Sequence, residues 1–261
     1  MGKVVVVTSG KGGVGKTTIL ANLGIMLATN GKMVCLVDAD IGLNNLDVVI
    51  GVENKIVYDL IDCIEGRCRP EQALIQTPFL DRLFVLPCCK LFDGKRVPIE
   101  KFSDVIGEIK NNFDYVLIDC PAGIGGGFYM SVEPSDCALV VVTPTISSIR
   151  DADKVIQLLK ANKTSDIKLV VNRISRNKVI KNEMIDADQI EELLGIEIVG
   201  IIPESDELNM YNSFLTKGAE FEDIDIKYAF GVFCKNFLTG GNEKFNYLAK
   251  RSWFLNLFKR C

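Results

Sequence analysis

Residues 4–20, VVVVTSGKGGVGKTTIL, constrain what this chain can fold into more than any other stretch. The four valines at 4–7 are a β-branched run of the kind that forms a strand buried on both faces of a parallel sheet. A glycine-rich turn follows, and the next apolar residues recur at helical spacing until Asn30 and Gly31 end the pattern. A strand, a glycine loop and a helix in this order are the setting of a phosphate-binding loop.

The loop satisfies the pattern G-x-x-x-x-G-K-[ST] through Gly10, Gly15, Lys16 and Thr17. Glycines let main-chain N–H groups turn inward around phosphate oxygens, and the start of a helix adds the positive end of its dipole. A lysine brings a positive charge to the β- and γ-phosphates, and a threonine hydroxyl can bind Mg²⁺. The predicted phosphate-binding residues are Gly10, Lys11, Gly12, Gly13, Val14, Gly15, Lys16, Thr17 and Thr18.

The same loop also fits a dinucleotide-binding pattern, G-x-G-x-x-G, through Gly10, Gly12 and Gly15, with Asp38 roughly 20 residues further on. The lysine and threonines that follow Gly15 decide between the two interpretations. A dinucleotide-binding helix has no use for a magnesium-binding hydroxyl beside a lysine, so we adopt the phosphate-binding loop.

Carboxylates follow two further apolar segments. The segment MVCLVDAD reads as a strand that ends in Asp38 and Asp40, and DYVLIDC reads as a strand that ends in Asp119. In an extended chain, Asp38 and Asp40 would point to the same side. The carboxyl ends of parallel strands face the ligand crevice, so we expect Asp38 and Asp119 to join Thr17 in holding Mg²⁺. Solvated turn aspartates are the alternative interpretation.

The remaining chain alternates strand-like runs with helical segments, which predicts an α/β fold with a mostly parallel sheet and helices on both faces. Residues 55–79 read as one or two short helices broken by Gly66 and Pro70. Three glycines at 125–127 suggest a loose loop after the strand that ends in Asp119. Further strands are expected near residues 82–87, 137–143, 166–174 and 196–203, with helices near 99–113, 145–160 and 225–238.

Composition limits the function classes. The chain has 261 residues and a net charge of −4, so its body offers no electrostatic argument for nucleic-acid binding. No run of about 20 apolar residues is present, so no segment is expected to span a membrane. The nine cysteines form no C-x-x-C pair and histidine is absent, which argues against zinc and excludes histidine acid–base chemistry. Free thiols and the lack of a signal segment favour the cytoplasm.

Several segments resemble the MinD/ParA family of P-loop ATPases, and its MinD members most closely. They are KGGVGKTT, with a second lysine at Lys11, and VDADIGLNNLD, PAGI and VVNR. The resemblance implies a homodimer with ATP in which Lys11 reaches the partner's nucleotide, Lys16 binds phosphate and Asp40 orients the attacking water. These three are the candidate catalytic residues, and turnover should be slow because no base stronger than a carboxylate is available. The residues implied to border the adenine are Asn172, Arg173, Pro203 and Glu204.

The chain departs from the usual relatives at Asn44, where arginine is frequent, and at Gly125 and Thr145, where glutamate is usual. We therefore assign to these three positions none of the roles that the arginine or glutamate has in relatives. Asp151 and Asp153 either meet a dimer partner or favour the dipole of the helix that begins near them, and both interpretations stay open.

The C-terminal residues read as a separate unit. Residues 240–244, GGNEK, are predicted to be a flexible hinge, which divides the chain into a P-loop ATPase domain at 1–239 and a tail at 240–261. At helical spacing the tail has an apolar arc with a basic border, which is typical of a helix lying in an anionic membrane surface. Docking on the body and binding a partner are the alternatives. The predicted membrane contacts are Trp253, Phe254, Leu257 and Phe258.

These features predict an ATPase that dimerises with ATP, binds the inner face of the cell membrane reversibly from the cytoplasm and positions a division inhibitor. By resemblance, its partners are a MinC-type inhibitor and either a MinE-type stimulator or a polar scaffold, and no specific nucleic acid is expected. The alternatives are a ParA-type partition ATPase that binds DNA, a MinD-like regulator of flagellar placement, and a nucleotide-dependent scaffold that does not hydrolyse ATP.

Overall fold

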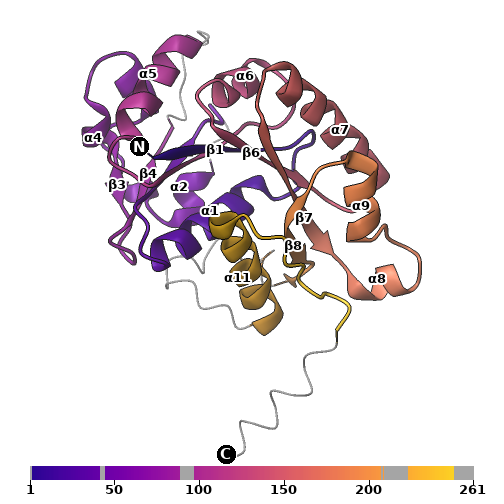
Figure 1. The fold of residues 1–261 in the computed structure, drawn as a ribbon. Coiled ribbons are helices and arrows are strands. Elements are labelled where there is room, and N and C mark those ends of the chain that lie inside the picture. The colour runs from indigo at the N-terminus through magenta and orange to yellow at the C-terminus, as the bar shows by residue number, and fades with distance from the viewer. Residues whose placement is uncertain (1, 42–44, 89–96, 207, 209–222, 250–261) are drawn as a thin grey trace, which may run out of the picture.

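An eight-stranded sheet runs through the part of the chain that the computed structural model describes, which is residues 2–41, 45–88, 97–206, 208 and 223–249 (Figure 1). The strand order is β3-β4-β2-β5-β1-β6-β7-β8, and all neighbours are parallel except β3 and β4. The strands are β1 (Lys3–Thr8), β2 (Val34–Asp38), β3 (Ile75–Gln76), β4 (Leu83–Leu86), β5 (Tyr115–Asp119), β6 (Cys137–Val142), β7 (Asp166–Ile174) and β8 (Ile198–Pro203).

Helices cover both faces of the sheet, with α1 beside α11 on one face and α5 and α6 on the other (Figure 1). The helices are α1 (Lys16–Thr29), α2 (Leu46–Ile50), α3 (Leu60–Ile64), α4 (Pro70–Ala73), α5 (Ile99–Ile109), α6 (Gly126–Val132), α7 (Ile146–Ala161), α8 (Arg176–Ile180), α9 (Ala187–Leu194) and α11 (Ile224–Thr239), with a 3-10 turn, η1 (Glu53–Lys55). The predicted fold class is confirmed.

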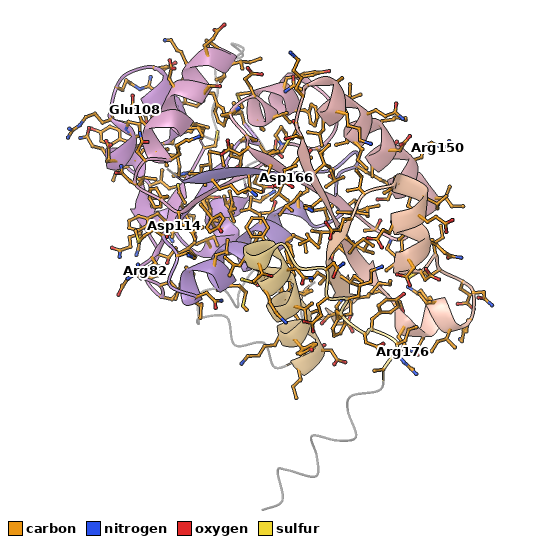
Figure 2. All side chains as sticks on the ribbon, in the orientation of Figure 1. Arg82, Glu108, Asp114, Arg150, Asp166 and Arg176 are labelled. Atoms are coloured by element: carbon orange, nitrogen blue, oxygen red, sulfur yellow. The ribbon has the colours of Figure 1, made fainter. Side chains whose placement is uncertain are left out.

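Strand β2 shows why both faces of the sheet are covered. Its side chains alternate, so Leu36 contacts α1 while Cys35 and Val37 belong to the core around Phe102 of α5. Gly24 of α1 makes the close approach possible, because a Cβ there would lie 2.6 Å from a Leu36 methyl carbon. Parallel strands buried on both faces need apolar residues at nearly every position, and the valine-rich strands supply them. Side chains fill the space between the sheet and its helices (Figure 2).

Two details differ from the sequence prediction. The glycines at 125–127 do not form a loose loop, because Gly125 precedes the first turn of α6 and the next two glycines lie within that helix. A Cβ on Gly127 would lie 2.5 Å from Cγ of Pro121, so glycine permits the close return of α6 onto the loop. Pro70 begins α4 instead of breaking a helix, as a proline at a first helical position does.

Residues 241–247 contact the body, and they include part of the segment 240–244 that is expected to be a hinge. Asn236 of α11 is buried, and its Nδ2 donates to the main-chain oxygens of Val199 and Glu243 at 3.1 and 2.7 Å. Its Oδ1 accepts from the Glu243 N–H at 3.1 Å. One amide side chain therefore joins α11, β8 and the chain that follows α11.

The next residues are held against α9. Lys244 makes ion pairs with Asp188 and Glu191 at 2.5 and 2.6 Å, and Phe245 is only 3% exposed. The Tyr247 hydroxyl accepts a hydrogen bond from the first main-chain N–H of α9 at 3.3 Å. The body thus extends past the boundary predicted at 239. The predicted membrane contacts lie outside the described residues; they are Trp253, Phe254, Leu257 and Phe258. Among the helices in the described ranges, none has the length and apolar character of a membrane-spanning helix.

We predict that Asn236→Ala lowers the free energy of unfolding by about 2–4 kcal/mol, because the buried main-chain groups of Val199 and Glu243 lose their partner. Urea unfolding of the full chain measures the change. Lys235→Ala is the matched control, since the neighbouring Lys235 reaches Glu243 only through an exposed ion pair. Equal losses in the two variants would contradict the assigned role of Asn236.

Candidate nucleotide-binding site

The glycine loop joins β1 to α1 at the carboxyl edge of the sheet, next to the ends of β2 and β5. Gly13 and Gly15 have φ values of 76° and 96°, which L side chains rarely adopt, so glycine is required there. Val14, between these two glycines, is buried and anchors the loop. Residues 11–13 are exposed. The loop therefore offers main-chain N–H groups to a ligand, and α1 begins immediately behind them.

Two contacts with distant parts of the chain fix the loop. Gly10 lies directly against Asp151 of α7, and a Cβ at Gly10 would overlap the main-chain oxygen of Asp151. Asn172 at the end of β7 donates from Nδ2 to the main-chain oxygen of Val14 at 2.8 Å. Sequence reasoning missed both contacts, and it proposed Asp151 only for a dimer face or a helix dipole.

Thr17 and Asp119 meet as the sequence predicts. The Thr17 hydroxyl donates to Oδ2 of Asp119 at 2.5 Å, while Oδ1 is buried without a hydrogen-bond partner among the described residues. Burial raises the pKa of Asp119 from 3.8 to about 6, although the Thr17 hydrogen bond and the charge of Lys16 act in the opposite direction. A buried carboxylate with an unpaired oxygen beside a phosphate-binding loop is suited to a cation.

Asp38 lies beside Asp119, because the two residues are in register at the ends of β2 and β5. Burial, followed by the charge of Asp119, raises the pKa of Asp38 to about 7. Its oxygens accept from the N–H groups of Asp40 at 2.9 Å and Leu46 at 3.4 Å, so this carboxylate also holds the turn after β2. The extended backbone expected between Asp38 and Asp40 ends at Asp38, and the half-buried Asp40 lies beyond the strand.

These oxygens fit a magnesium ion. Mg²⁺ prefers hard oxygen ligands, usually one or two carboxylates together with phosphates and water. Asp119, Asp38 and the Thr17 hydroxyl provide such oxygens beside the phosphate loop. No group of three or more His, Cys, Asp or Glu side chains in the described ranges could hold a metal by itself, so nucleotide phosphates would have to complete the shell.

A narrow pocket next to the loop contains most of the expected adenine-binding residues. Asn172, Arg173 and Pro203 line it together with Gly15 and Thr18, and their role in binding adenine stays a prediction. Its volume of about 20 Å³ is less than a purine needs, so a base would have to widen it.

Two expected adenine-binding residues have other contacts. Oδ1 of Asn172 accepts the N–H of Arg173 at 2.9 Å, while its Nδ2 holds the glycine loop. Glu204 is exposed, forms an ion pair with Lys178 at 3.0 Å and does not line this pocket. Lys11 is exposed in the glycine loop and forms no ion pair with any residue in the described ranges.

We predict that Asp119→Asn stabilises the metal-free, nucleotide-free protein at high pH. Because burial raises the folded-state pKa of Asp119 from 3.8 to about 6, ionisation costs the folded state stability. The cost is absent below about pH 4, grows as the pH rises to about 6, and reaches about 3 kcal/mol above that. Urea unfolding at pH 4 and pH 8 should show the advantage of the variant mainly at pH 8.

Asp104 is exposed, so Asp104→Asn is the control for that measurement. Its free energy of unfolding should differ from that of the unsubstituted chain by the same small amount at both pH values. An Asp119→Asn protein that is no more stable than the unsubstituted chain at pH 8 would contradict an unpaired buried charge at Asp119.

Comparison with known proteins identifies the family of this chain. Residues 5–214 match the family described as the CobQ/CobB/MinD/ParA nucleotide binding domain. The septum site-determining protein MinD of Bacillus subtilis is 51% identical over 211 residues, which are 80% of this chain and 78% of that protein.

Two solved structures have the same fold. A chain of the MinC:MinD cell division protein complex of Aquifex aeolicus has a TM-score of 0.85 and 43% identity, covering 92% of this chain and 97% of that chain. The septum site-determining protein MinD of Pyrococcus horikoshii, complexed with Mg-ADP, has a TM-score of 0.80 and 26% identity, covering 91% of this chain and 96% of that chain. The chain belongs to the MinD family within the CobQ/CobB/MinD/ParA nucleotide-binding domains.

Proposed function

We propose that this chain is a Mg²⁺-dependent ATPase that dimerises with ATP, binds the inner face of the cell membrane reversibly and so positions inhibition of cell division. The observation that carries the proposal is the contact between Thr17 and Asp119 at the end of the glycine loop. It leaves a buried carboxylate oxygen unpaired where a nucleotide's cation would lie. The complex of the Pyrococcus horikoshii relative with Mg-ADP supports this assignment.

Each residue of the site has a proposed role. The N–H groups of the glycine loop and Lys16 hold the phosphates, and Thr17, Asp38 and Asp119 hold Mg²⁺. When bound, Mg²⁺ neutralises charge on the phosphate oxygens. Asp40 follows the end of β2 and orients the attacking water with its carboxylate, which makes a slow hydrolase.

The surroundings of the site support a dimer. Lys11 of the glycine loop is exposed, as a lysine that reaches a second subunit's nucleotide would need to be. Ile124 and Ile146, which follow β5 and β6 at the same edge of the sheet, are 50% and 72% exposed. Exposed apolar side chains around a ligand site are suited to contact with another protein.

The role in division rests on the relatives. The Bacillus subtilis relative is named a septum site-determining protein, and the Aquifex aeolicus structure is a MinC:MinD complex. We therefore propose a MinC-type inhibitor as a partner, with a MinE-type stimulator or a polar scaffold as regulator. Membrane attachment would be peripheral, through Trp253, Phe254, Leu257 and Phe258 of the tail. The chain's net charge of −4 gives the ParA-type alternative little electrostatic support.

We predict that Asp40→Ala lowers the rate of phosphate release from ATP at least about tenfold while ATP binding persists, because a water-orienting carboxylate acts in the chemical step. Steady-state phosphate release and ATP binding are measured on the same preparations. Asp104→Ala on the exposed surface of α5 is the control and should leave both unchanged. If Asp40→Ala releases phosphate at the normal rate, Asp40 has no such role.

Sedimentation with anionic vesicles tests the membrane switch. We predict that the full chain pellets with Mg-ATP but not with Mg-ADP, because a dimer presents two tails and gains about 10²–10⁴ in avidity. A chain ending at Ala249 should pellet with neither nucleotide. This end point matters, because ending near Gly241 would also remove the body contacts of Glu243 and Phe245.

Equal pelleting of the full chain with both nucleotides would contradict the switch. Equal pelleting of the shortened chain would place the membrane contact on the body. DNA binding by either chain at physiological salt would favour the partition ATPase instead.

A further inference from the structure

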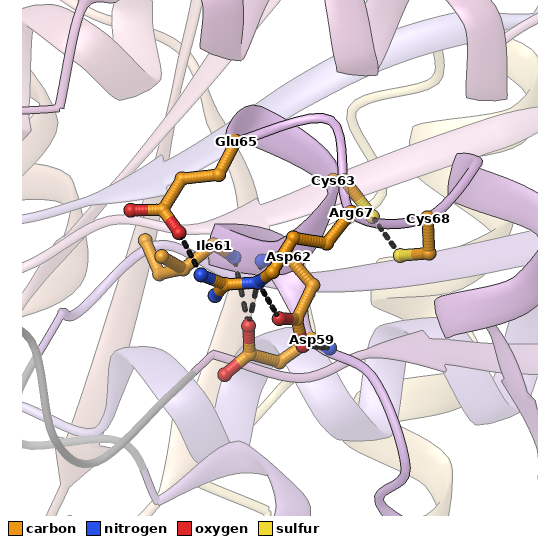
Figure 3. Close-up of polar contacts among 7 residues, drawn as sticks. All are labelled: Asp59, Ile61, Asp62, Cys63, Glu65, Arg67 and Cys68. Atoms are coloured by element: carbon orange, nitrogen blue, oxygen red, sulfur yellow. Dashed lines mark hydrogen bonds and ion pairs between the residues drawn. The ribbon is translucent and has the colours of Figure 1, made fainter.

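Two cysteines outside the nucleotide site lie side by side after α3 (Figure 3). The sulfur atoms of Cys63 and Cys68 are 3.6 Å apart. Cys63 is in the last turn of α3 and is buried, with 8% exposed, whereas Cys68 lies in the following loop and is partly exposed.

The end of α3 explains why two cysteines five positions apart meet. Gly66 has a φ of 75°, its N–H donates to the main-chain oxygen of Cys63 at 3.0 Å, and the N–H of Arg67 donates to that of Asp62 at 2.9 Å. This pair of hydrogen bonds is a Schellman motif, which reverses the chain at a helix end. The reversal returns Cys68 to the last turn of α3.

Side chains reinforce the reversal. Arg67 donates from Nε to Oδ1 of Asp62 at 2.6 Å and also pairs with Glu65 (Figure 3). The other oxygen of Asp62 accepts the N–H of Asp59 at 2.9 Å, while Asp59 caps the start of α3. Asp62 therefore contacts both ends of this short helix. Its hydrogen bonds stabilise the turn that places the two thiols next to each other.

The thiols open onto a cleft. Cys63 and Cys68 line a surface cleft of about 580 Å³ between the α3–α4 loop and α5, with Arg69 and Lys101 also on its wall. Burial, followed by contact with Cys68, raises the pKa of the Cys63 thiol above its ordinary value. Of the two, Cys68 is therefore the thiol that meets a reagent from solution first.

We propose that Cys63 and Cys68 are a thiol–disulfide site, which closes to an intramolecular disulfide by exchange with a small-molecule disulfide that enters this cleft. The Cys68 thiolate attacks one sulfur of the reagent, forms a mixed disulfide and displaces the first thiol. Cys63 then attacks the Cys68 sulfur and displaces the second thiol. The two protons of the protein thiols end on the two released thiols, so the protein is oxidised and the reagent is reduced by two electrons.

The geometry permits this closure. A disulfide bond is about 2 Å long, so the two sulfur atoms need to approach by roughly 1.5 Å. The partly exposed Cys68 side chain is free to supply that movement while buried Cys63 stays in place. In a reducing compartment the pair would remain as thiols and close only when small disulfides accumulate.

The test uses full-length protein equilibrated with oxidised and reduced glutathione at a series of ratios. Free thiols are then blocked in denaturant before digestion with trypsin. Trypsin cleaves after Arg67 but not between Arg69 and Pro70, so the two cysteines fall in peptides 56–67 and 68–82. We expect these two peptides to become joined, with the mass of the pair lower by two hydrogen atoms, and to separate again when reduced glutathione is in excess.

Alanine variants test the order of attack. Cys63→Ala should retain a glutathione adduct on Cys68, because the resolving thiol is gone. Cys68→Ala should leave the buried Cys63 unmodified. Cys234→Ala, in the remote helix α11, is the matched control and should still give the joined peptides.

The proposal is overturned if oxidised glutathione in large excess leaves both cysteines free, or leaves Cys68 only as a glutathione adduct in the unsubstituted chain. It is also overturned if the peptides join only after the protein has been unfolded.

Discussion

The buried carboxylates at the ends of β2 and β5 are the feature on which the rest of this structure depends. Asp38 and Asp119 lie side by side at the sheet's carboxyl edge, and burial raises the pKa of both. Two adjacent buried carboxylates cost the protein stability unless a cation offsets their charge. The Thr17 hydroxyl at the start of α1 contacts one oxygen of Asp119 and the other is unpaired, and we propose that a cation bound with phosphate at the glycine loop completes the site. Because the two buried carboxylates destabilise the empty site, binding of a cation there would relieve that cost.

Strands β7 and β8 connect the nucleotide site to the chain's later segments. Asn172 holds the glycine loop from β7, and Pro203 at the end of β8 lines the pocket beside it. Asn236 and Lys244 then fasten the chain after α11 to β8 and α9. A tail that follows Ala249 would start from a fixed point on the body, so its reach is set by its own length and not by a glycine hinge.

Local patterns in the sequence predicted much of this structure. The valine run of β1, the glycine loop and the acidic strand ends are local signals. The structure brings the expected residues Thr17, Asp38 and Asp119 together, and their role in holding Mg²⁺ stays a prediction. The contact of Asn172 with Val14 joins residues 158 positions apart, and no local pattern carries it. The sequence GGNEK resembles a linker, but its partners on α9 and α11 are set by tertiary contacts. Strand β3 has two residues and exists only through its pairing with β4.

The most direct test is a calorimetric titration of Mg-ADP into metal-free unsubstituted protein and Asp119→Asn at pH 6 and pH 8, in buffers of different ionisation enthalpy. The pKa of Asp119 is about 6 without a cation, so at pH 6 the unsubstituted protein should release more protons on binding than the variant does. At pH 8 that difference should vanish, while the variant should still bind Mg-ADP more weakly. If both proteins bind equally tightly with equal proton release, Asp119 is not a magnesium-binding residue, and the account of this site is wrong.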